Sequence, residues 1–125
     1  MQRLLMSAAV LEASTGLALI AVPTLVARLL LGDEVTGSGI AIVRIAGIAL
    51  LSFGVACWPP RGQQDLINSH RTPPVLAMFV YNLLITLFLV GLGATSRSVG
   101  ILLWPGAALH SVFTLLFAHG LVRRH

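Results

Sequence analysis

Four apolar runs divide this sequence, and each is about as long as a membrane is thick. They lie at about residues 4–22, 40–58, 75–93 and 101–121. A hydrocarbon core of about 30 Å takes roughly 20 helical residues to cross. A helix also satisfies its backbone polar groups internally, as lipid requires. The sequence therefore predicts an all-α integral membrane protein, a four-helix bundle in a single domain over residues 1–125.

The composition supports a chain surrounded by lipid. Hydrophobic residues make up 57% of it and charged residues 10%, whereas soluble domains carry about 25% charged residues. The net charge of +4 would suggest nucleic acid in a soluble protein. Here arginines flank the apolar runs, where they meet lipid phosphates and set topology. We expect the bilayer as a partner and no nucleic acid.

Prolines and glycines set the expected helix ends. Pro23 ends or kinks the first helix, and the chain after it is expected to continue for about two helical turns at the interface until Gly32. Pro59 follows the interfacial Trp58, and Pro105 suits the first turn of the fourth helix. Mostly short connections favour antiparallel neighbours, hence an up-down-up-down order.

Arginine counts predict the orientation. Five arginines fall on the side of the two termini and the middle connection, against two on the other side, with one more inside the second helix. Cytoplasmic loops carry the excess of positive charge, so both termini are expected in the cytoplasm. The five are Arg3, Arg61, Arg71, Arg123 and Arg124, and the two are Arg28 and Arg97.

A layer of polar residues crosses the apolar runs. At 1.5 Å per residue, Glu12, Asn82 and His110 share a slab near the midplane, and Arg44 lies closer to the outer end of its helix. Each has small or hydroxyl residues on the same helical face, which suggests that all four point inward. Tyr81, beside Asn82, either joins them or faces lipid.

Three interpretations of this layer stay open: a structural hydrogen-bond network, a ligand or proton site, and a contact with another subunit. Intramembrane ionisable groups are costly, which makes a functional site a standing hypothesis. We expect Arg44 to offset Glu12, with Asn82 and His110 completing the network. Ala9, Ala13 and Gly16 form a small-residue stripe beside Glu12 that predicts self-association.

Standard catalytic and metal patterns do not appear in the sequence. His110 and His119 are nine residues apart, about 180° around a helix, and so cannot grip one ion together. A haem would need His110 and a further ligand such as Met78. The single Cys57 allows no internal disulfide. We expect no catalytic residue, metal or cofactor, and the sequence names no reaction, so an enzymatic activity is left open.

Two short stretches resemble the DoxX-like group of small bacterial four-helix membrane proteins. They are "VRIAGIALLSFGVA" in the second helix and "LLWPGAALH" opening the fourth. The resemblance implies a bacterial cytoplasmic membrane. Some members of the group are linked to membrane redox complexes, which implies an accessory subunit. The chain is also similar to small multidrug-resistance transporters in size and in Glu12, but its second and third helices lack their aromatic and glycine signature.

Two functions follow from these observations. The first is a small membrane protein that binds a ligand or a partner protein through Glu12, Arg44, Asn82 and His110, within a homo-oligomer or a larger membrane complex. The alternative is a proton-coupled small-molecule transporter that uses Glu12. Proton coupling requires Glu12 to gain and lose a proton with access to both sides of the membrane, whereas an accessory protein requires neither.

Overall fold

The computed structural model describes residues 1–58, 73–96 and 99–123, and these are helical apart from short connections. The helices are α1 (Gln2–Ala21), α2 (Pro23–Leu31), α3 (Ser38–Ala56), α5 (Pro73–Thr95) and α6 (Leu103–Val122). All but α2 are long and apolar enough to cross a membrane. The chain is thus all-α and has the helix composition of a multi-pass membrane protein, with the four spans close to the four predicted runs.

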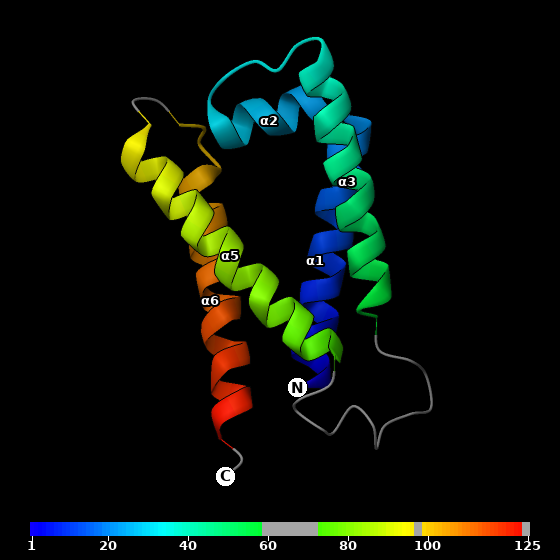
Figure 1. The fold of residues 1–125 in the computed structure, drawn as a ribbon, viewed down its shortest axis with the longest axis vertical. Coiled ribbons are helices and arrows are strands. Elements are labelled where there is room, and N and C mark those ends of the chain that lie inside the picture. The colour runs from blue at the N-terminus through cyan, green and yellow to red at the C-terminus, as the bar shows by residue number, and fades with distance from the viewer. Residues whose placement is uncertain (59–72, 97–98, 124–125) are drawn as a thin grey trace.

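The short helix α2 changes the expected architecture. Pro23 starts it after a break at Val22 (φ −132°, ψ 59°), and Gly32 ends it in the left-handed conformation at φ 85°. Its length fits the predicted two turns. However, α2 lies across one end of the long helices and does not extend α1 (Figure 1). Over the described residues the fold is therefore four long helices and a transverse fifth, not a plain four-helix bundle.

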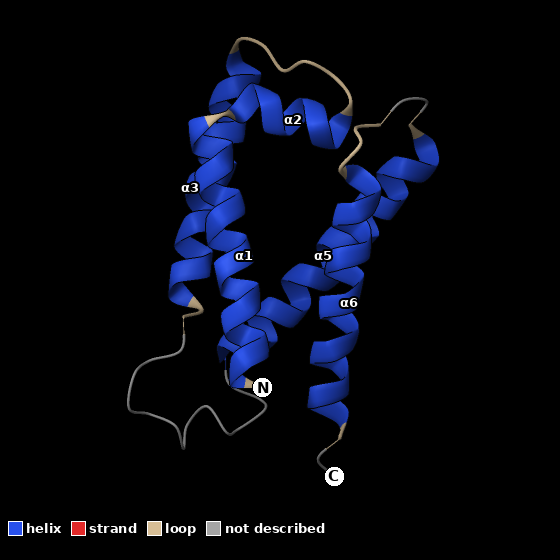
Figure 2. Ribbon diagram, turned by 180° about the vertical axis from the view of Figure 1, so that it is seen from behind, coloured by secondary structure: helices blue, strands red, loops and turns tan. Residues whose placement is uncertain are grey.

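The long helices form two pairs, α1 with α3 and α5 with α6. Figures 1 and 2 show the pairs diverging toward the end that α2 crosses. Glycines bring α1 and α3 together: a Cβ on Gly16 would lie 2.6 Å from the Gly47 carbonyl oxygen, and one on Gly54 would lie 2.7 Å from that of Ala9. Close backbone approach of this kind is how helices pack in lipid.

This packing corrects the interpretation of the small-residue stripe. Ala9 and Ala13 contact Gly54, and Gly16 contacts Gly47 and Leu51. The stripe is thus covered by α3 of the same chain and offers no free surface to a second chain. The sequence reasoning failed here because small residues predict a close helix neighbour without saying whether it belongs to the same molecule.

The two pairs meet in a core near the chain termini. It contains residues from all four long helices or their ends: Leu5, Ala8, Ala9, Cys57, Val75, Met78 and Phe117. Met1 and the end of α6 lie at this end of the molecule, opposite α2 (Figure 1). This fits the predicted common side for the termini. That this side is the cytoplasm stays a prediction, and Arg61, Arg71, Arg97 and Arg124 lie outside the described residues.

At the opposite end, α2 joins the two pairs through backbone hydrogen bonds. Gly100 N–H donates to the Leu30 carbonyl at 3.2 Å, and Leu102 N–H donates to the Leu29 carbonyl at 2.8 Å. These are carbonyls of the last helical turn, which have no partner within the helix. Gly100 packs directly on the backbone of Leu29. The helix pairs are therefore fixed at both ends, by the core at one and by α2 at the other.

The outer faces of the helices are apolar. Ile42 and Ile45 on α3, Leu87 on α5 and Leu115 on α6 are each more than 60% exposed. Large exposed apolar side chains on several neighbouring helices mark a surface that does not face water. The distribution agrees with lipid around the long helices.

Candidate functional site

A buried polar network links helices from both pairs. Glu12 on α1 is 1% exposed, and Asn82 on α5 is fully buried. His110 Nδ1 on α6 lies 2.8 Å from Asn82 Oδ1 and 3.8 Å from Glu12 Oε1. The three residues that depth counting placed in one slab are therefore in contact. Glu12 approaches His110 across the boundary between the helix pairs.

The Asn82 amide fixes which nitrogen of His110 carries the proton. Asn82 Nδ2 donates to the Met78 carbonyl oxygen at 2.8 Å, so Oδ1 is the atom that faces His110. An amide oxygen only accepts hydrogen bonds. His110 Nδ1 must therefore donate, and in the neutral ring the lone pair lies on Nε2.

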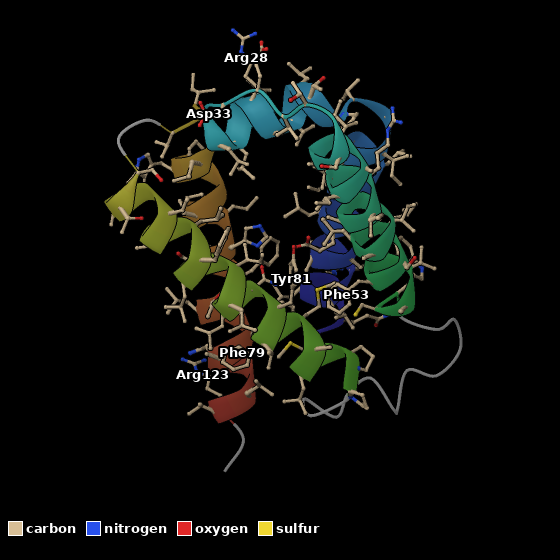
Figure 3. All side chains as sticks on the ribbon, turned by 45° about the horizontal axis from the view of Figure 1, so that its top comes forward. Arg28, Asp33, Phe53, Phe79, Tyr81 and Arg123 are labelled. Atoms are coloured by element: carbon tan, nitrogen blue, oxygen red, sulfur yellow. The ribbon has the colours of Figure 1, made fainter. Side chains whose placement is uncertain are left out.

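Tyr81 completes the network. From the sequence it could either join the polar layer or face lipid, and in the structure it points inward. Its ring centroid lies 5.2 Å from that of Phe53 and 5.9 Å from the His110 ring, in an edge-on arrangement with the latter. Its side chain lies beside the Glu12 carboxyl group. Figure 3 shows Tyr81 and Phe53 close together in the space between α5 and the α1–α3 pair. Phe53 had no polar signal in the sequence and was missed.

Arg44 does not join the network. Its side chain is exposed, and within the described parts of the chain the basic side chain within 4 Å of Glu12 is that of His110. Gly16 opposes Gly47 where α1 and α3 touch. Arg44 lies three residues beyond that contact and Glu12 four residues to the other side, a separation of roughly 10 Å along the helices. The expected Glu12–Arg44 pair is thus replaced by a Glu12–His110 contact.

The network leaves polar atoms without partners. Glu12 Oε1 and Thr86 Oγ1 are buried and have no hydrogen bond in the described part of the protein. Most buried polar atoms in proteins are hydrogen-bonded, so each exception calls for a reason. For Glu12 the deficit is greatest, because a carboxyl group at membrane depth is already costly.

A cavity of about 710 Å³ lies between the two helix pairs, and the network forms part of its wall. Each of the five described helices contributes to the lining, which is almost entirely apolar. Tyr81 and His110 bring polar atoms to it, and Thr15 brings a hydroxyl that donates to the Leu11 carbonyl. Representative apolar wall residues are Leu19, Leu30, Ala49, Ile85, Phe88 and Pro105. The sequence could not reveal this cavity, because its existence depends on the divergence of the pairs.

The cavity opens at its side. Phe88 and Leu102 line it and are themselves 62% and 43% exposed, so the wall is continuous with the outer apolar surface.

The described residues hold no group of three or more His, Cys, Asp or Glu side chains able to bind a metal ion. His119 is exposed at the end of α6, while His70 and His125 lie outside the described residues. Cys57 is buried, with Sγ 4.0 Å from the Pro74 carbonyl oxygen. The residues that meet in the described site are thus Glu12, Tyr81, Asn82 and His110.

Comparisons of the chain with protein-family models, with curated proteins and with solved structures find no match. The resemblance to the DoxX-like group therefore stays a hypothesis, and the shared feature that the structure supports is the set of four candidate membrane helices.

Proposed function

We propose that this multi-pass membrane protein binds an apolar small molecule in the cavity between its helix pairs, with Glu12, Tyr81, Asn82 and His110 as the polar end of the site. One observation carries the proposal: a cavity of about 710 Å³ whose apolar wall meets a buried polar network. Small-molecule sites are typically cavities of about 300–1,000 Å³ with a few placed polar groups.

The polar network supports a site more than a purely structural role. A network that only fixed helix register would gain from full satisfaction, since each buried unpaired atom costs about 1–3 kcal/mol. Here Glu12 Oε1 has no hydrogen-bond partner in the described residues, and two members of the network, Tyr81 and His110, line the cavity. An incompletely satisfied network with two members in the wall of an apolar cavity is suited to a ligand site.

The proposed setting is the bacterial cytoplasmic membrane, with both termini in the cytoplasm. The arginine count and the resemblance stated from the sequence support it. A role as an accessory subunit of a larger membrane complex, or a homo-oligomer, fits the same proposal. Any such contact has to use the outer helix faces, because α3 covers the stripe of Ala9, Ala13 and Gly16.

The test uses one-to-one binding of a long-chain apolar probe, dodecyl methyl ether, measured by native mass spectrometry from mild detergent. Ala49→Trp places a large side chain in the cavity wall, whereas Ala41→Trp changes an exposed alanine of the same helix that is not in the wall. We expect a single bound probe in the wild type and in Ala41→Trp, and none in Ala49→Trp. Binding that is equal in all three proteins contradicts the proposal.

A proton-coupled transporter built on Glu12 would show one further property. Ligand binding would change the proton content of the protein, which calorimetry in buffers of different ionisation enthalpy measures. A binding protein without coupling shows the same binding heat in each buffer.

A further inference from the structure

The cavity wall presents one particular kind of polar atom. His110 lines the cavity, and its Nδ1 is committed to Asn82 Oδ1 at 2.8 Å. Since Asn82 Nδ2 is held by the Met78 carbonyl, the amide cannot turn to offer a donor instead. The histidine ring is thus fixed as a donor at Nδ1 and an acceptor at Nε2. A ring nitrogen held in this way by a partner on its other side is a common arrangement at ligand-binding histidines.

The acceptor at Nε2 is available. No hydrogen-bond partner of Nε2 occurs among the described residues, and this atom is absent from their buried unpaired atoms, so it is accessible. The Tyr81 ring packs edge-on against the His110 ring at 5.9 Å, which holds the ring plane. Since Nδ1 faces Asn82, the opposite edge of the imidazole is the one left for the cavity.

Two other polar side chains lie in the described wall. The Thr15 hydroxyl donates to the Leu11 carbonyl at 2.9 Å, and Tyr81 lies beside Glu12. The lone pair of His110 Nε2 is thus an open acceptor position in the wall. Glu12 lies on the Nδ1 side of the same ring, with Oε1 3.8 Å away. Its carboxyl group makes the region unfavourable for an anion.

We infer that the ligand is an apolar alcohol, whose hydroxyl group donates a hydrogen bond to His110 Nε2 while its hydrocarbon body fills the cavity. This rests on the proposed function and specifies its ligand class. A ligand whose polar end only accepts, such as an ether or an ester, would set a lone pair against a lone pair. A site built to hydrogen-bond a hydroxyl group binds analogues that lack it more weakly, because its own polar group is then left unpaired.

The experiment compares three probes with the same chain length: 1-dodecanol, dodecyl methyl ether and laurate. Competition between pairs of probes is measured by native mass spectrometry. We expect 1-dodecanol to bind at least about 10-fold more tightly than the ether, and laurate to bind more weakly than the alcohol. In His110→Phe, which keeps a ring but removes the acceptor, the alcohol and the ether should bind equally. Retained ether binding in this variant shows that the cavity still forms.

The two proposals fail differently. If Ala49→Trp blocks the binding of none of the probes, the proposed function itself is wrong. If the ether binds at the cavity as tightly as the alcohol, or if laurate binds most tightly, the cavity is a ligand site but the alcohol assignment is overturned. A preference for the alcohol that persists in His110→Phe also overturns the role of Nε2.

A second measurement does not depend on any variant that folds poorly. Nitrogen-15 NMR of histidine-labelled protein distinguishes the Nδ1–H from the Nε2–H tautomer. The His110 signal is expected to show the Nδ1–H tautomer, with a shift at Nε2 when 1-dodecanol is added and none when the ether is added. An Nε2–H tautomer in the free protein overturns the inference.

Discussion

His110 on α6 donates from Nδ1 to Asn82 Oδ1 on α5 at 2.8 Å, so the two helices of one pair share a side-chain hydrogen bond at membrane depth. The bond does more than join neighbours, because Asn82 is itself anchored to Met78. The orientation of one amide thereby sets the tautomer of a ring that faces a different helix pair.

Breaking this bond from the asparagine side should destabilise the protein. Asn82→Leu keeps the branched shape but leaves the buried His110 Nδ1–H without its acceptor, at a cost of about 1–3 kcal/mol. The free energy of unfolding in mixed micelles measures the loss. His110→Phe added to Asn82→Leu removes the unpaired donor, so the double variant should lose less than the sum of the two single losses. Additive losses would contradict a direct bond.

The contact between α1 and α3 depends on glycine at position 16. A Cβ there would lie 2.5 Å from Leu51 N and 2.6 Å from the Gly47 oxygen, both backbone atoms that cannot move aside. Gly16→Ala should therefore cost about 1–3 kcal/mol, measured by thermal unfolding in detergent. The matched control is Gly91→Ala on α5, where a Cβ has no neighbour within 4 Å. That change should be neutral or stabilising by up to about 1 kcal/mol.

Glu12 and Arg44 should behave as independent sites. Arg44 is exposed and Glu12 contacts His110, so Glu12→Gln and Arg44→Gln should lower the free energy of unfolding additively within about 0.5 kcal/mol. The double-mutant cycle measures the coupling energy between the two side chains, which should be close to zero. A coupling energy well above that margin would show that the two side chains meet.

Cysteine labelling tests the orientation. In a Cys57→Ala background, Thr36→Cys and Ser96→Cys should react in intact cells with a reagent that cannot cross the membrane, because both lie at the α2 end. Gln64→Cys, at a position outside the described residues, should react only after lysis. Labelling of Gln64→Cys from outside would reverse the predicted topology.

The elements that could be predicted from the sequence are those set by local chemistry. Long apolar runs gave the four spans, since length and hydropathy suffice to cross a bilayer. Pro23 and Gly32 marked the ends of α2. Counting residues from the helix ends placed Glu12, Asn82 and His110 at one depth, because rise per residue is nearly constant.

The features that could not be predicted depend on how helices are placed relative to one another. Pro23 indicates that the chain breaks, but not that α2 then runs across the molecule. Counting residues along the helices placed Arg44 within reach of Glu12 in depth. It did not show which way Arg44 points around the axis of α3, and the side chain is exposed. The cavity arises from the divergence of two pairs that are themselves tightly packed, and no single segment encodes that divergence.

The joint between α2 and the segment before α6 has a consequence for how this fold can vary in evolution. Its hydrogen bonds run from the backbones of Gly100 and Leu102 to carbonyls of Leu29 and Leu30, so changes of side chain at 29, 30 or 102 leave the bonding groups in place. Position 100 is different, because any Cβ would meet the Leu29 backbone. Divergent chains that share this architecture are thus better recognised by a glycine after the third long helix than by any conserved polar residue at that joint.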